Sequence, residues 1–271
     1  MTNSDVFVGR FQFLRVFRYP LKQLSKPLSR REFMAKKIVV YTAQIGSKGR
    51  SGHLAAAPQL DNALFYLFTD RDECVIADDP VSHLGWGMCG LEDTPTWTTH
   101  TYLQAVLWHK THPHILFPDA DHVLWIDPQI EFAPSRLESL PDLQKFPQPL
   151  VTFRHGSRSS VLQEMVAAFR SKLYPPRAVT KQVADYQREG YPDYYLQADT
   201  RVLWRQQTPE VNAFNELWWD EILNRSSCDQ LSFGYALWCL NKVSRLDVGF
   251  MPGCVERNPW FQLQRAVKEN L

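Results

Sequence analysis

The chain has 271 residues, enough to bury the core of one large α/β domain or of two small ones. Its 30 lysine and arginine residues nearly balance 29 aspartate and glutamate residues, so no overall basic charge favours wholesale binding of nucleic acid. Five scattered cysteines without a CxxC pair indicate neither a zinc site nor a disulfide framework, and they favour a reducing compartment.

Residues 1–36 differ in composition from the rest of the chain. Between Arg10 and Lys37 nine basic residues stand against one acid, Glu32, and phenylalanines alternate with the first cations. Such an arm is suited to an anionic membrane surface, although arms of this kind more often pack their rings on the main domain. The chain lacks a stretch of about 18 apolar residues and a signal-peptide core. We therefore expect a cytoplasmic protein, with peripheral contact of the arm at the inner face of the membrane as a hypothesis.

Residues 37–271 are predicted to form one α/β domain, because short apolar runs alternate with segments of helical periodicity. Strands are predicted, in chain order, at residues 37–43, 64–70, 75–77, 122–126, 150–153, 200–204 and 243–248. Helices are predicted at residues 97–109, 134–140, 161–173, 209–223 and 228–240. Ser226 or Ser227 is expected to cap the last helix. Residues 174–200 hold prolines, tyrosines and acids, and they predict an irregular region that could form an acceptor pocket.

The predicted strand at residues 122–126 carries the strongest candidate for a functional acid. Asp127 follows this strand directly, and ligands of open α/β sheets bind outside the carboxyl ends of the strands. Asp127-Pro128-Gln129 therefore takes the place of a DxD-type metal site. Asp119 and Asp121 precede the strand and are predicted to be turn residues. Asp127 could alternatively serve only to cap the turn that follows it.

Other polar residues stand where predicted elements end. Thr42 and Asp70 would reach the same edge of a parallel sheet. The cationic turn at residues 154–158 suits a phosphate or a sugar carboxylate, although one of its arginines could simply pair with a structural acid. His112 and His114 have no carboxylate or thiol partner at metal spacing, so they are expected to be solvated loop residues.

A series of motifs in fixed order links these elements. The motifs are VVYTAQIG, LFTD, K-x3-H, WIDPQ, RH-x2-R-x5-E, WW-x-EI and DQLSF, spread over residues 37–240. The set resembles a glycosyltransferase-like family, formerly a domain of unknown function, of bacterial surface-polysaccharide proteins and of plant Golgi proteins that act on cell-wall mucilage. The resemblance implies a GT-A-like fold, a single nucleotide-binding α/β domain whose mixed, mostly parallel central sheet is flanked by helices.

The resemblance also implies roles for individual residues. The nucleotide and sugar would contact Thr42, Ala43, Asp70, Lys110, His155 and Arg158. Asp127 and Gln129 would hold Mn²⁺ or Mg²⁺, although Gln129 is a neutral ligand and no third ligand is assigned. The catalytic residues would be Asp229, Gln230 and Glu164, with Asp229 or Glu164 stabilising an oxocarbenium-like transition state, or Asp229 acting as base. An acid in the first turn of a helix, such as Asp229, can also serve only to compensate the helix dipole.

These implications predict a glycosyltransferase that moves a sugar from a nucleotide-diphosphate donor, foremost a UDP-sugar, to a glycan acceptor in surface polysaccharide synthesis. The Asp229-Gln230 pair weakly favours retention over inversion. The alternative is a catalytically degenerate GT-A-like protein that binds a glycan or a partner, and the neutral Gln129 motivates it. A third hypothesis is a membrane-surface scaffold that uses residues 1–36. The absence of G-x-S-x-G and HExxH disfavours the common hydrolase classes.

Overall fold

The computed structural model describes residues 38–46, 57, 63–70, 86–91, 101–133 and 142–263. Its centre is a seven-stranded sheet of order β3-β2-β1-β4-β7-β6-β8. The strands are β1 (Ile38–Gln44), β2 (Ala63–Thr69), β3 (Gly87–Cys89), β4 (His122–Ile126), β6 (Leu150–Arg154), β7 (Ala198–Gln206) and β8 (Val248–Phe250). β7 runs antiparallel to both of its neighbours, and every other pair in this sheet is parallel. The predicted mixed, mostly parallel sheet is therefore confirmed.

A small second sheet holds the chain just after β4. Its strands β5 (Ile130–Phe132) and β9 (Phe261–Leu263) pair antiparallel, with Phe132 opposite Phe261. The amide of Ile130 also donates to the carbonyl oxygen of Asp127, at 2.8 Å. The sequence did not predict this sheet, which fixes the turn that follows Asp127.

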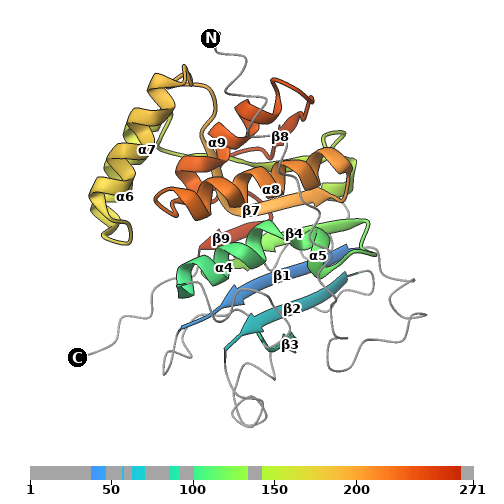
Figure 1. Cartoon of the computed structure of the whole chain (residues 1–271). Helices are drawn as coiled ribbons and strands as arrows, with labels where there is room; N and C mark the ends of the chain where they lie inside the picture. Colours follow the sequence, from blue (N-terminus) through green and yellow to red (C-terminus); the bar gives the residue numbers. More distant parts are fainter. Residues whose placement is uncertain are drawn as a thin grey trace.

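Helices flank the central sheet and form a layer on one of its faces (Figure 1). They are α4 (Tyr102–Thr111), α5 (Pro113–Leu116), α6 (Val161–Ser171), α7 (Pro176–Arg188), α8 (Pro209–Asn224) and α9 (Asp229–Leu240). α4 packs on β1 and α8, whereas α6 packs on α7 and α9. At the N-termini of α4, α6 and α8, a backbone amide of the first turn donates a hydrogen bond to the side-chain hydroxyl of Thr101, Ser160 or Thr208, respectively. These caps explain where the three helices begin, because they satisfy otherwise unpaired amides of the first turn.

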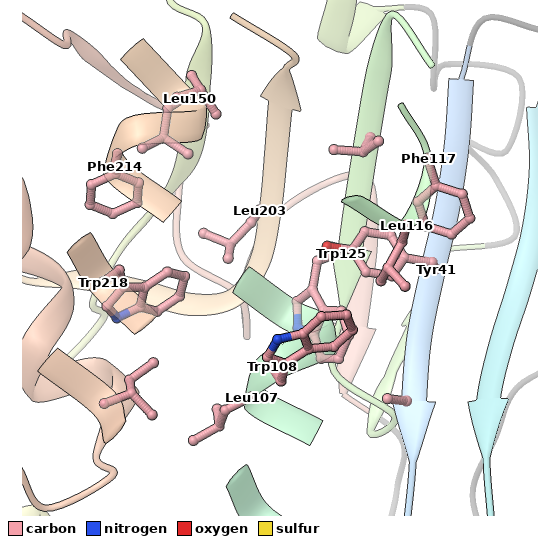
Figure 2. Packing of buried hydrophobic residues seen from close by; sticks show 14 of the residues in the cluster. Tyr41, Leu107, Trp108, Leu116, Phe117, Trp125, Leu150, Leu203, Phe214 and Trp218 are labelled. Carbon is pink, nitrogen blue, oxygen red and sulfur yellow. The ribbon is translucent and has the colours of Figure 1, made fainter. Parts of the chain in front are cut away.

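The sheet separates two apolar layers of the core, and a third apolar cluster lies among α6, α7 and α9. Figure 2 shows Tyr41, Trp125 and Leu203, from three adjacent strands, in the layer that α4, α8 and α9 cover. Their sequence neighbours Leu124 and Trp204 lie in the other layer. Successive strand residues point to opposite faces, so a strand covered on both faces is apolar throughout. This explains why the runs at β1 and β4 could be recognised as buried strands.

The pairing of β6 with β7 is irregular. Val151 lies opposite Trp204, yet Phe153 lies opposite Asp199, so β7 has extra residues between these pairs. The hydroxyl oxygen of Thr152 lies 2.7 Å from the carbonyl oxygen of Asp199 and 2.8 Å from that of Val202. The buried hydroxyl thus offers a hydrogen bond to backbone carbonyls that have no partner strand amide where the ladder is interrupted.

Most predicted elements that fall on described residues are confirmed. These are the strands at 37–43, 64–70, 122–126, 150–153 and 200–204, and the helices at 161–173, 209–223 and 228–240. The predicted helix at 97–109 is confirmed over its described part, as α4. The predicted strand at 75–77 and the predicted helix at 134–140 lie outside the described residues.

Two predicted segments and one cap were wrong. Residues 176–188 of the expected irregular region form α7, which buries Val179, Val183 and Tyr186. The helix begins with a proline, and the first helical position tolerates proline because the backbone amide there has no partner within the helix. The last predicted strand, 243–248, is replaced by β8 at Val248–Phe250. The N-cap of α9 is Cys228, without a side-chain cap bond, because the Ser226 hydroxyl instead bonds Gln182 of α7.

Within the described ranges, none of the helices combines the length and the apolar character needed to cross a membrane. Residues 1–36 lie outside these ranges, so the membrane contact of the arm stays a prediction. The cytoplasmic location and the division of the chain after residue 36 also stay predictions.

Candidate active site

A buried lysine lies at the centre of a polar cluster beyond the end of β4. Lys110, in the last turn of α4, is 2% exposed. Its Nζ donates to Asp229 Oδ2 at 2.7 Å, to Thr200 Oγ1 at 3.2 Å and to Asp127 Oδ1 at 3.3 Å. An ammonium has three hydrogens, so these partners use all of them. The lysine thereby joins α4, α9, β7 and the end of β4.

Asp127 has a structural role at the end of β4, and its role as a metal ligand stays a prediction. Its Oδ1 accepts from Trp125 Nε1, at 2.7 Å, in addition to Lys110. Its backbone amide donates to the carbonyl oxygen of Arg201 at 2.8 Å, so the residue also organises the exit from β4. Burial raises the pKa of Asp127, and the charge of Asp229 raises it further, although Lys110 opposes both effects.

Asp229 is the first residue of α9, and its surroundings stabilise the carboxylate. Thr200 Oγ1 lies 2.7 Å from its Oδ2, and Trp218 Nε1 donates to its carbonyl oxygen at 3.1 Å. Burial by itself would raise the pKa of Asp229, but Lys110, together with hydrogen bonds from Thr200 and the backbone of Gln230, holds this pKa below its ordinary value. The pKa of Lys110 is in turn raised, because the two acids outweigh its own burial. The cluster thus favours the ionised form of Asp229, whereas burial disfavours the ionised form of Asp127.

Gln230 turns its side chain towards β7. Its Oε1 accepts from the backbone amide of Thr200 at 2.6 Å and lies 2.6 Å from Thr200 Oγ1. The side-chain carbonyl oxygen of Gln230 is therefore occupied by Thr200. The side-chain NH₂ group of Gln230 is the part that could bind a ligand.

A second polar group contains Arg158, Glu164 and His155. Arg158 Nε donates to Glu164 Oε2 at 2.5 Å, and Glu164 is 4% exposed. Burial raises the pKa of Glu164, the charge of Asp229 also raises it, and Arg158 lowers it. His155 Nδ1 accepts from the backbone amides of Ser157 and Arg158, at 3.2 and 3.1 Å. Burial and then Arg158 lower the pKa of His155, so the ring is a neutral Nε2–H donor.

Thr42 and Ala43 lie on β1, and Asp70 directly follows β2. Ala43 and Asp127 each lie two residues beyond the paired Tyr41 and Trp125, which puts them at one sheet edge. Thr42 is fully buried, and its Oγ1 has no hydrogen-bond partner among the described residues. Asp70 Oδ2 accepts from the amide of Gly46, at 3.0 Å, and so anchors the turn after β1. Their contact with a nucleotide stays a prediction.

A divalent cation would find few protein ligands here. Among the residues that can be described, no three His, Cys, Asp or Glu side chains are grouped so that they could hold a metal. Asp127 Oδ2 and the amide oxygen of Gln129 fit as a partial site, because Mg²⁺ commonly keeps waters and binds through one or two carboxylates plus substrate phosphates. The predicted metal therefore stays a prediction.

The expectation for the two histidines was wrong. His112 is 3% exposed and stacks on Trp108 with ring centroids 4.6 Å apart. His114 Nε2 lies 2.8 Å from Glu216 Oε1, a carboxylate supplied by α8 from 102 residues further along the chain. Both rings therefore join helices and do not lie in a solvated loop.

Sequence reasoning also missed several residues that surround Lys110. Trp125 could have been found, because it precedes Asp127 by two residues and so points to the same face of β4. Tyr174 lies in the connection between α6 and α7, and burial followed by the charge of Asp229 raises its pKa. Thr200 carries no sequence signal, because its partners come from distant parts of the chain.

Comparison with known proteins identifies the family. Residues 105–264, more than half of the chain, match the family described as "TOD1/MUCI70, glycosyltransferase-like domain", and the chain belongs to this family. "Probable hexosyltransferase MUCI70" of Arabidopsis thaliana is 28% identical over 161 residues. That match covers 56% of this chain and 27% of the relative, so the chain spans about a quarter of the relative's length.

Solved structures of glycosyltransferases overlap with this fold in part. Mouse xyloside xylosyltransferase 1 has a TM-score of 0.42 and 9% identity, covering 76% of this chain and 81% of its own. The bifunctional glycosyltransferase WbbM has a TM-score of 0.46 and 15% identity, covering 86% of this chain and 40% of its own. These TM-scores describe only a partial superposition, and no chemistry follows from them.

Proposed function

We propose that the protein is a glycosyltransferase that moves a sugar from a nucleotide-diphosphate donor, foremost a UDP-sugar, to a glycan acceptor. The observation that carries this proposal is the buried cluster of Lys110, Asp127 and Asp229 beyond the end of β4. Ligands of open α/β sheets bind at this place. All three residues lie in the segment that matches a glycosyltransferase-like family, and a hexosyltransferase is among the relatives.

The residue types suit the chemistry of glycosyl transfer. The reaction breaks the bond between the anomeric carbon and the diphosphate, through a transition state with positive charge on the sugar ring. The ionised Asp229 stabilises this charge, or it accepts the proton of the acceptor hydroxyl. His155 Nε2–H and the free guanidinium nitrogens of Arg158 donate to oxygens of the departing diphosphate. A divalent cation held by Asp127 and Gln129 would supply further neutralising charge.

Nucleotide binding and turnover test this proposal directly. We expect UDP or GDP with Mn²⁺ at one hundred times the dissociation constant to stabilise the protein by about 2.7 kcal/mol in thermal unfolding. Release of the nucleoside diphosphate from a panel of nucleotide-sugars, with glycan acceptors present, measures transfer.

Asp229→Asn should reduce transfer at least 100-fold. Asp247→Asn, which removes an exposed acid paired with the exposed Arg245, is the matched control and should keep wild-type transfer.

The same experiment separates the alternative function. Stabilisation by glycans without any effect of nucleotides would favour a degenerate GT-A-like binding protein, which the neutral Gln129 motivates. Retention, a role in surface polysaccharide synthesis and membrane contact of the arm are further parts of the proposal. Product anomeric configuration tests the first, and liposome association of a chain lacking residues 1–35 tests the last.

A further inference from the structure

We propose that Lys110 occupies the place between Asp127 and Asp229 that a shared divalent cation would take, so that a metal binds here only together with a diphosphate. The second part of this inference rests on the proposed function, whereas the first part concerns the protein alone.

The ammonium leaves no room for a metal bound by both acids. Lys110 Nζ lies 2.7 Å from Asp229 Oδ2 and 3.3 Å from Asp127 Oδ1. A divalent cation shared by these oxygens would lie between them, about 2.0–2.6 Å from each and so closer than Nζ does, and it would overlap the ammonium that now bridges them. The indoles of Trp125 and Trp218 flank it, with Nζ 5.7 and 6.0 Å from their ring centroids. The lysine is thus enclosed, and its ammonium would have to leave all three of its hydrogen-bond partners to make way for a metal.

The remaining ligand positions are too weakly charged to hold a metal alone. Asp127 Oδ1 is used by Lys110 and Trp125, which leaves Oδ2, 3.5 Å from the amide nitrogen of Gln129. The Asp127 side chain is 20% exposed and that of Asp229 is 10% exposed, so the accessible side of the cluster is at Asp127. One carboxylate oxygen and one neutral amide oxygen fill two of the six positions that Mg²⁺ prefers.

Charge explains why a diphosphate would complete the site. The ammonium and the two carboxylates together carry one negative charge, which disfavours a free diphosphate. A divalent cation bound to the diphosphate lowers the negative charge of the ligand, presents its own positive charge to Asp127 and takes further oxygen ligands from the diphosphate. Binding of metal and of nucleotide should therefore be strongly synergistic, and Lys110 is the residue that enforces it.

Thermal unfolding with Mn²⁺ alone, UDP alone and both together tests this inference. In the wild-type protein Mn²⁺ alone should leave the melting temperature unchanged. Lys110→Ala should create a site for Mn²⁺ between the carboxylates of Asp127 and Asp229. Gln129→Asp should place a second carboxylate beside Asp127 on the exposed side of the cluster. A cation present at one hundred times its dissociation constant should raise the melting temperature of either variant by roughly 5–10 °C.

Two matched variants serve as controls. Lys110→Arg keeps a cation between the acids and should not respond to Mn²⁺ alone. Gln129→Ala should respond less than wild type to the two ligands together. Gln129 is exposed, so Gln129→Asp remains informative if Lys110→Ala does not fold.

Specific results would overturn the inference. A response of the wild-type protein to Mn²⁺ alone as large as that of Gln129→Asp would show that the site needs no diphosphate. A folded Lys110→Ala variant without any response would show that the lysine does not stand in a cation position. If UDP never binds but Lys110→Ala gains Mn²⁺ binding, the proposed function fails while the role of Lys110 stands.

Discussion

Acidification should lower the stability of this protein because His109 is buried in a neutral form. The ring is 0% exposed, packs on Phe68 with ring centroids 4.6 Å apart, and its Nδ1 lies 2.7 Å from the carbonyl oxygen of Ala105. Its Nε2 has no hydrogen-bond partner among the described residues. Burial lowers the pKa of His109 from 6.5 to about 4. A native pKa below the unfolded value means that stability is present above pH 6.5 and is lost as the pH falls.

The size of this loss follows from the pKa shift. Between pH 6.5 and about pH 4 the unfolded chain binds a proton that the native ring does not bind. The free energy of unfolding therefore falls by about 1.4 kcal/mol per pH unit, which amounts to about 2 kcal/mol at pH 5. His112, whose pKa burial lowers to about 3, adds a loss of the same sign.

Urea unfolding at pH 7.5 and pH 5.0 measures the contribution of His109. His109→Asn offers an amide donor to Ala105 without a titrating group, so it should lose about 2 kcal/mol less than wild type over this interval. Leu107→Ala, a buried change on the same helix, is the control and should lower stability equally at both pH values. Identical pH dependence of His109→Asn and wild type would refute the reasoning.

Two further substitutions test the packing around the site. Thr200→Val removes the hydroxyl beside Lys110 and should lower the free energy of unfolding by about 1–3 kcal/mol in urea, whereas Thr200→Ser should stay near wild type. Equal stability of the two variants would contradict the hydrogen bonds of Thr200. Gly234→Ala would put a Cβ 2.3 Å from Tyr191 Oη and should cost about 1–3 kcal/mol. Gly90→Ala, with no atom within 4 Å of the new Cβ, should be neutral in the same thermal unfolding assay.

The parts of the site that the sequence predicted are those encoded locally. A buried strand of apolar residues at 122–126 ends at Asp127, and both the strand and the acid at its end follow from a few adjacent residues. The last helix was predicted to begin at Cys228, one residue before α9 starts, because a helical pattern follows two serines; the serine cap itself was wrong. These features need no knowledge of the rest of the chain.

The parts that the sequence did not predict depend on long-range contacts. Lys110 finds its acids 17 and 119 residues away, and Thr200 reaches it across 90 residues. The hydrogen bond of His114 to Glu216 spans 102 residues. Such partners become neighbours only once β7 and the helices have packed on the sheet, so neither periodicity nor composition reveals them.

The interrupted ladder between β6 and β7 determines which face of the sheet carries Thr200. Towards the end of β7, Leu203 faces the helix-covered layer and Trp204 the opposite layer, so even-numbered residues point away from α9. Thr200 is also even-numbered, yet it bonds Lys110 and Asp229 on the helix side. The irregularity therefore inverts the phase of side-chain alternation within a single strand. In a regular strand, Arg201 would share the helix-side face with Leu203, so it is this irregularity that presents Thr200 to the cluster in place of Arg201.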